Sequence, residues 1–234
     1  MTRILSPILL LVFLFPSLAL GETMDDLVER DGLHYKKFSL VPFTGKITGD
    51  EQGSVKNGKK HGPWVSYHDN GQLFMKGTYK DGKEDGPWVI YWDNGQLREK
   101  GTYKDGKKAG PWVDDSSLPW VKQTSKGTYK NGKKNGPWVT YHDNGRLSDK
   151  GTYKNGKEDG PYVSYHDNGQ LFLKGTYKDG KRVGPWVSYH KNGQLEFKGT
   201  YKNGKWDGPW VDYKEDGTVN EMFTGTYKDG EKVK

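Results

Sequence analysis

The chain has 234 residues, no cysteine, 33 glycines, 14% aromatic residues and a formal net charge of +7 at pH 7. Its mean hydropathy of −0.98 argues against a thick aliphatic core, whereas the aromatic content excludes a disordered chain, which would lack such rings. The absence of cysteine excludes disulfides and thiolate metal sites.

Residues 1–21 have the pattern of a secretory signal peptide. Arg3 precedes a largely apolar run over residues 4–15, and Pro16 and the small-residue exit Ala19-Leu20-Gly21 follow it. This pattern is typical of a cleaved leader. We expect cleavage near Gly21 and an exported protein, periplasmic or secreted. An uncleaved anchor is the alternative, although the run is short for a membrane span. Nucleic acid is not an expected partner of an exported chain, despite its basic charge.

A repeat occupies most of the remaining chain. Gly-Pro-Trp begins at residues 62, 86, 110, 136, 184 and 208, with Gly-Pro-Tyr at 160, and Gly-Thr-Tyr-Lys begins at 77, 101, 127, 151, 175, 199 and 225. The period is 24 residues, and the Gly-Pro-Trp/Tyr series has one interval of 26, between residues 110 and 136. We predict a repeat array over residues 53–222, between an N-terminal cap at 22–52 and a C-terminal cap at 223–234.

Two turn signals divide each unit. Asp-Gly or Asn-Gly occurs once after Gly-Thr-Tyr-Lys, as in Asp81-Gly82, and Asn-Gly occurs again near the end of the unit, as in Asn70-Gly71. Both dipeptides suit tight hairpin turns. The segments between them are rich in Tyr, Trp, Val and Thr, which favour strands. The sequence therefore predicts an all-β fold, an elongated single-layer antiparallel β-meander of about seven 24-residue hairpin repeats.

Two-residue turns predict a register for this meander. We expect four opposed pairs, Tyr79 with Glu84, Gly77 with Gly86, Trp64 with Gly77, and Tyr67 with Phe74. A bulged second loop would shift the register by one residue. A Trp ring over Gly77 would explain why the equivalent glycine is present in every unit. Equivalent side chains lie about 9.5 Å apart, so the tryptophans should form one ladder and the tyrosines another.

Two regions are candidate binding surfaces. The first is the tryptophan ladder, formed by Trp64, Trp88, Trp112, Trp138, Trp186 and Trp210. The second is an irregular loop at 114–126, where an acidic, proline-containing segment with Asp114, Asp115 and Trp120 replaces the usual turn. Packing alone would also account for the ladder, and a decayed repeat for the loop. The regular lysines either form a basic stripe that attracts anions or only keep the sheet soluble.

Comparison between units argues against a metal site at the repeated stretch YHDNGQL. The position of His68 is Trp92 in the next unit and Lys214 in the last, and a ligand set does not tolerate such replacements. We expect these histidines to lie exposed beside a turn. The chain has no G-x-S-x-G, H-E-x-x-H or P-loop motif, so we predict no catalytic residues, no cofactor and no enzyme.

The stretch GTYKNGKKNGPWVTYHDNGRLSDKG resembles the MORN-repeat variant of bacterial proteins known as YwqK-family antitoxins of toxin–antitoxin systems. The shared pattern joins Tyr-x-x-Asn-Gly-x-Leu to Gly-x-Tyr-x-[Asp/Asn]-Gly-Lys-x-x-Gly-x-Trp and covers about residues 53–230. This resemblance implies a non-enzymatic, protein-binding scaffold, with a toxin-like protein as partner. The residues themselves leave an alternative, a cell-envelope binder whose aromatic ladder and lysines hold glycan or anionic lipid.

Overall fold

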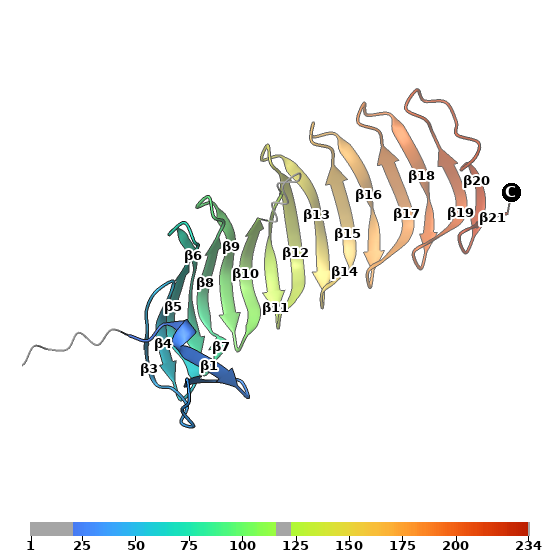
Figure 1. The fold of residues 1–234 in the computed structure, drawn as a ribbon. Coiled ribbons are helices and arrows are strands. Elements are labelled where there is room, and N and C mark those ends of the chain that lie inside the picture. The colour runs from blue at the N-terminus through green and yellow to red at the C-terminus, as the bar shows by residue number, and fades with distance from the viewer. Residues whose placement is uncertain (1–20, 116–122, 234) are drawn as a thin grey trace, which may run out of the picture.

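The computed structural model of the chain describes residues 21–115 and 123–233, and its strands form one long, bowed sheet (Figure 1). The fold class predicted from the sequence, an elongated single-layer antiparallel meander of hairpin repeats, is confirmed. The predicted leader falls almost wholly on residues 1–20, outside the described residues, and so does Trp120.

Each unit contributes two long strands. The strands that carry Gly-Thr-Tyr-Lys, or its equivalent in the first unit, are β4 (Glu51–Lys56), β6 (Leu73–Lys80), β9 (Leu97–Lys104), β11 (Gln123–Lys130), β13 (Leu147–Lys154), β16 (Leu171–Lys178), β18 (Leu195–Lys202) and β20 (Gly225–Lys228). The strands that carry Gly-Pro-Trp or Gly-Pro-Tyr are β5 (Lys59–Tyr67), β8 (Gly86–Tyr91), β10 (Lys107–Asp115), β12 (Lys133–His142), β15 (Gly160–Tyr165), β17 (Lys181–Tyr189) and β19 (Lys205–Asp212). The remaining elements are short: η1 (Met24–Asp26), β1 (Leu27–Arg30), β2 (Leu33–Lys36), β3 (Gly45–Ile47), β7 (Lys83–Glu84), β14 (Lys157–Glu158) and β21 (Glu231–Lys232).

The sheet is open at both ends. Neighbouring strands pair antiparallel in chain order from β3 to β21, and the short β7 and β14 extend the hairpins at β6 and β13. Among the described strands, β3 pairs with β4 alone and β21 with β20 alone. The two end strands therefore lie at opposite ends of the molecule (Figure 1).

The first turn of each unit is the predicted two-residue hairpin. Asp81 and Gly82 both have positive φ, at 52° and 84°, as the turn requires, and the predicted pair of Tyr79 with Glu84 is confirmed. The second turn is longer. Only its glycine has positive φ, 79° at Gly71, and Gln72 N donates to Asn70 Oδ1 at 3.0 Å.

Two predicted pairs are wrong, and both errors come from bulges. Tyr67 pairs with Leu73 instead of Phe74, because the longer second turn takes up an extra residue. Gly77 does not pair with Gly86, since the register between β6 and β8 shifts between Tyr79 and Lys76. Gly86 has a φ of 113°, so the glycine bends the strand there.

The predicted contact between a Trp ring and a glycine is present, but it joins different partners. Trp64 does pair with Gly77. The ring over Gly77, however, is that of Trp88, from the second strand of the same unit, and the Trp64 ring lies over Gly53 in the same way. Each indole therefore packs on the first strand of its own unit, while its backbone pairs with the glycine of the next unit, as Trp88 does with Gly101.

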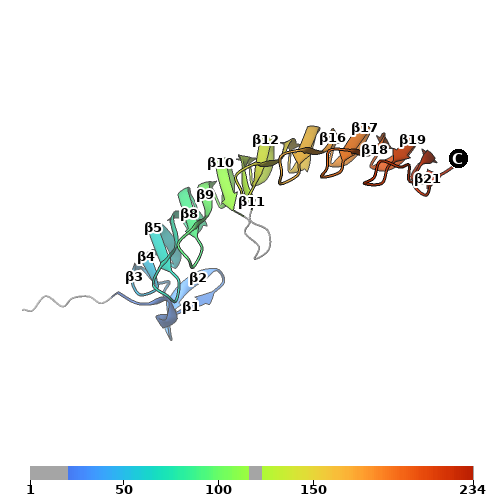
Figure 2. The ribbon, with the colours of Figure 1, turned by 90° about the horizontal axis from the view of Figure 1, so that it is seen from above.

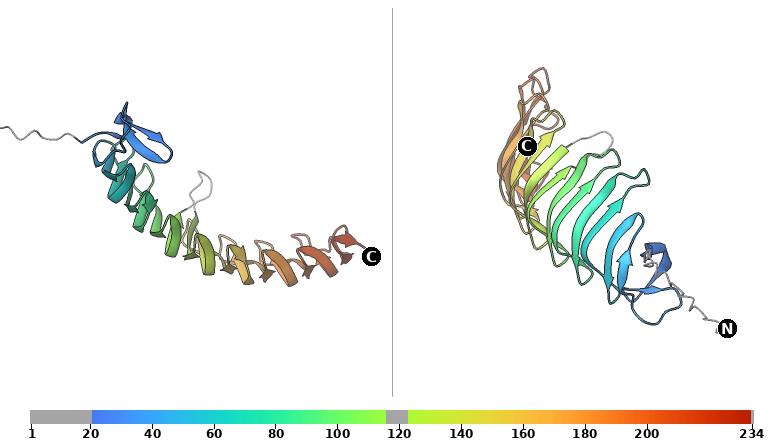
Figure 3. Two further views of the ribbon diagram at one scale, coloured as in Figure 1. Left: turned by 90° about the horizontal axis from the view of Figure 1, so that it is seen from below. Right: turned by 90° about the vertical axis from the view of Figure 1, so that its left-hand side faces the viewer.

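A small hairpin covers one end of the tryptophan side of the sheet. β1 and β2 form a two-stranded sheet of their own, which lies on the inner side of the bow (Figures 2 and 3). Leu27 of β1 belongs to a buried cluster with Val55, Trp64 and Met75. The inner side of the bow is thus the tryptophan face.

Candidate functional site

The tryptophan and tyrosine series form one interleaved ladder on the tryptophan face, where two ladders were predicted. Tyr79 lies between Trp64 and Trp88, with ring centroids 5.8 and 5.3 Å apart and the rings nearly perpendicular. The same edge-to-face contacts repeat along the array from Trp64 to Tyr153 and from Tyr177 to Trp210. Such contacts stabilise a pair beyond its buried area by about 0.5–1.5 kcal/mol.

Basic side chains cover several of the indoles. Lys60 Nζ lies 4.3 Å from the Trp64 ring centre, and Lys108, Lys134 and Arg182 cover Trp112, Trp138 and Trp186 in the same way, at 4.2 to 4.5 Å. The six predicted tryptophans that the structure describes are only 0–6% exposed. The structure brings these residues together on one face, but their rings are used for packing.

Burial keeps the tyrosines of the ladder protonated. Desolvation, aided by Glu84, raises the pKa of Tyr79 from 10.0 to about 12. Burial likewise raises the pKa of Tyr103, Tyr153 and Tyr162 to about 12. These four phenol groups are therefore uncharged across the physiological pH range.

The predicted acidic residues lie in strands. Asp114 and Asp115 end β10 and pair with Ser125 and Thr124 of β11, so the described parts of segment 114–126 continue the sheet on either side of residues 116–122. Burial, aided by the neighbouring Glu99, raises the pKa of the Asp114 carboxyl.

The repeated histidines and asparagines connect successive units. His166 Nε2 lies 2.8 Å from the Tyr189 carbonyl oxygen, and Asn168 Nδ2 donates to the Lys191 carbonyl oxygen at 2.9 Å. Equivalent bonds start from His68, Asn70, His142, Asn144, His190 and Asn192. The prediction of exposed histidines is wrong, because these rings are half-buried between turns. Within the described ranges no group of three or more His, Asp or Glu side chains is placed to hold a metal ion.

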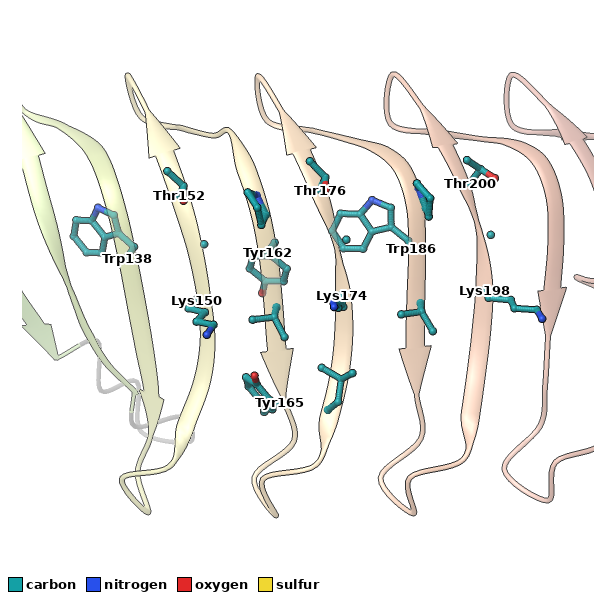
Figure 4. A pocket seen from close by; sticks show the side chains of 18 of the residues that line it. Trp138, Lys150, Thr152, Tyr162, Tyr165, Lys174, Thr176, Trp186, Lys198 and Thr200 are labelled. Atoms are coloured by element: carbon teal, nitrogen blue, oxygen red, sulfur yellow. The ribbon is translucent and has the colours of Figure 1, made fainter.

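The opposite face carries a groove that sequence reasoning missed. Prolines, valines and threonines line it across β12 to β19, together with Trp138, Tyr162 and Trp186, and its volume is about 1320 Å³. Lys150, Lys174 and Lys198 lie along it on every second long strand, β13, β16 and β18 (Figure 4). We call this surface the proline–valine face. The sequence does indicate this face in every unit. Pro and Val flank each Trp, and neighbouring side chains of a strand point to opposite faces of the sheet.

Comparison with known families identifies the repeats. Residues 60–81, 84–105, 134–155, 158–179 and 182–203 match the MORN repeat variant, and residues 52–63 and 126–137 match the MORN repeat. Residues 106–125, which include the irregular unit, match neither family. No curated protein matches the chain. The described residues include no helix with the length and hydrophobicity needed to cross a bilayer.

Proposed function

We propose that this all-β array of MORN-type repeats is a non-enzymatic scaffold that binds another protein along the groove of the proline–valine face. The observation that carries the proposal is the groove itself, an apolar channel of about 1320 Å³ that runs across four units. The aromatic ladder behind it supplies a stiff support, since each indole packs against two units.

The groove favours an extended, acidic segment as its ligand. Its floor consists of Pro and Val side chains, which suit apolar contacts, and Lys150, Lys174 and Lys198 are exposed beside it. These lysines recur every second strand, or about every 9.5 Å, so several carboxylates of one extended chain would meet a positive charge. We infer a partner that the protein meets after export. A toxin-like protein neutralised in an antitoxin or immunity role is the specific form that the sequence resemblance supports.

A charge-reversal experiment tests this proposal. The mature chain is immobilised, partners are captured from a periplasmic extract, and the dissociation constant of the retained protein is measured. Replacing Lys150, Lys174 and Lys198 by Glu should weaken binding at least tenfold, because three attractive contacts become repulsive. The matched control replaces the exposed Lys154, Lys202 and Lys228, which lie on equivalent strands outside the groove. Equal loss in both variants, or no retained protein at all, would contradict the proposal.

The same row of lysines favours a second candidate, a protein that binds anionic lipid at the cell envelope. Vesicles of phosphatidylglycerol and of phosphatidylcholine distinguish this candidate from a protein-binding role. Sedimentation with the anionic vesicles alone, lost in the groove variant and kept in the control, would support lipid binding. No sedimentation with either vesicle would exclude it.

A further inference from the structure

One unit of the array departs from the others on the tryptophan face. At residue 162 the usual indole is replaced by Tyr162, and Glu158 occupies the position where Lys134 and Arg182 cover a ring in neighbouring units. A Cβ atom on Gly175 would lie 2.1 Å from the Trp186 ring, whereas a Cβ atom on Gly151 would lie 3.1 Å from Tyr162. The smaller ring is therefore less tightly seated than the indoles.

The residues around Tyr162 are also more polar than their counterparts. Asp149 stands where other units have Met75, Leu173 or Phe197, and Ser148 stands where others have Phe74 or Phe172. Together with Gln123, His142 and His166, these side chains line a cavity of about 510 Å³. This volume is within the range of small-molecule sites. The apolar packing of the regular units is thus replaced here by a polar pocket.

The pocket contains a buried hydroxyl with spare hydrogen-bonding capacity. Ser164 is 7% exposed, and its Oγ atom interacts with the Tyr162 phenol but makes no hydrogen bond of standard geometry in the described part of the chain. At the same position of the next unit, Ser188 Oγ donates to the Phe172 carbonyl oxygen at 3.0 Å. Asp149 lies opposite Ser164 on the neighbouring strand. A buried hydroxyl without a well-formed hydrogen bond is unfavourable, so a ligand that bonds to Ser164 would gain stability from this contact.

The other polar groups offer both donors and acceptors. His142 and His166 each use Nε2 on a backbone carbonyl oxygen, at 3.0 and 2.8 Å, so the Nδ1 atom of the neutral ring remains an acceptor. Asp167 is paired with Lys191 at 2.7 Å, which reduces the net charge at the rim. Such a mixture suits a ligand with many hydroxyl groups and no charge.

Aromatic surface is available beside these polar groups. Phe172 and Tyr162 both line the cavity, and Phe172 is 38% exposed. Sugar rings present hydroxyls at their edges and apolar C–H groups on their faces, and such a site provides for both. We propose that this pocket binds a pyranose unit of a neutral glycan. Ser148, Asp149 and Ser164 line the pocket and not the groove, although Tyr162 and Tyr165 line both. The inference goes beyond the proposed protein-binding function and does not rest on it.

Oligosaccharide titration tests this inference. Cellotriose, maltotriose and chitotriose are titrated into the mature chain, and binding is followed by calorimetry and by ligand-observed NMR. We expect at least one of them to bind. Ser164→Ala should weaken that binding at least tenfold. Ser66→Ala is the matched control, because Ser66 has the same repeat position and the same 7% exposure but lies far from the pocket.

A second variant separates loss of the pocket from loss of the fold. Tyr162→Trp restores the residue of the regular units, which should fill the cavity, raise the Tm and abolish sugar binding. Protein capture by the groove should be unchanged in Ser164→Ala, because Ser164 lines the pocket and not the groove. The inference is overturned if none of the three sugars binds the wild type, or if Tyr162→Trp binds sugar as well as the wild type does.

Discussion

The small size of glycine determines how the tryptophans pack. The Trp186 side chain is 1% exposed and lies so close over Gly175 that any Cβ atom there would overlap the ring, at 2.1 Å. Glycine is required at this position for lack of space and not for its backbone conformation, because Gly175 is not among the residues with positive φ. The glycine of the Gly-Thr-Tyr motif therefore leaves the space that the indole from the second strand of the same unit occupies.

A pair of alanine substitutions tests this view. Gly175→Ala should lower the free energy of unfolding by about 1–3 kcal/mol, the usual cost of overpacking. Gly151→Ala should cost clearly less, because its nearest atom belongs to Tyr162, at 3.1 Å. Urea denaturation followed by circular dichroism measures both changes. Equal costs at the two glycines would show that the indole contact does not set the requirement.

At the scale of the elements, the second turn of each unit acts as a connector. Asn168 accepts from Gln170 N at 3.0 Å within its own turn and donates to the Lys191 carbonyl oxygen of the next turn at 2.9 Å. Asn94 likewise accepts from the backbone N–H of Gln96 within its own turn. Its Nδ2 atom, however, donates to the Gln96 side chain of the same turn, because the unit that follows lacks the Asn-Gly turn. A comparison of Asn168 with Asn94 therefore measures the contribution of the hydrogen bond between units.

Substitution by aspartate removes the donor and keeps the acceptor. Asn168→Asp should therefore destabilise the protein by about 1 kcal/mol, the net value of a typical hydrogen bond, whereas Asn94→Asp should have a smaller effect. Chemical denaturation at high salt, which screens the added charge, measures the difference. If both variants lose the same stability, the bond to Lys191 contributes nothing.

The sequence was sufficient for the strands and for the first turn of each unit, because Asn-Gly and Asp-Gly impose local backbone angles there, but it did not predict the length of the second turn. It predicted the pairs of Tyr79 with Glu84 and of Trp64 with Gly77, which were confirmed. It failed at Tyr67 and at Gly86, where a bulge depends on how two strands share their hydrogen bonds. The pocket near Tyr162 was missed for a similar reason: the replaced Trp was visible in the sequence, but the space left around Tyr162 depends on packing between units.

Across the whole molecule, the ladder makes stability depend on pH. Tyr79, Tyr103, Tyr153 and Tyr162 have pKa values of about 12 in the folded chain, raised from 10.0 mainly by burial. The unfolded chain therefore loses these protons first. Stability should be complete below pH 10 and should fall as the pH rises from 10 toward 12.

An alkaline titration checks this expectation. Phenolate absorbance should lag behind that of free tyrosine and then rise together with the loss of the far-ultraviolet circular dichroism signal. Tyr162→Phe, which removes one of the four groups, should make the fold more resistant to alkali. Phenolate formation near pH 10 in a chain that stays folded would contradict the assignment.

The unpaired end strands also determine how this protein can change in evolution. A closed sheet has a fixed number of strands, whereas β3 and β21 leave both ends of this one open. Duplication of one 24-residue unit would insert two more strands and lengthen the molecule by about 9.5 Å, while each existing unit kept the kind of neighbours that it has now. The length of the sheet can therefore change by whole units, and it can be matched to the length of the binding surface that a partner requires.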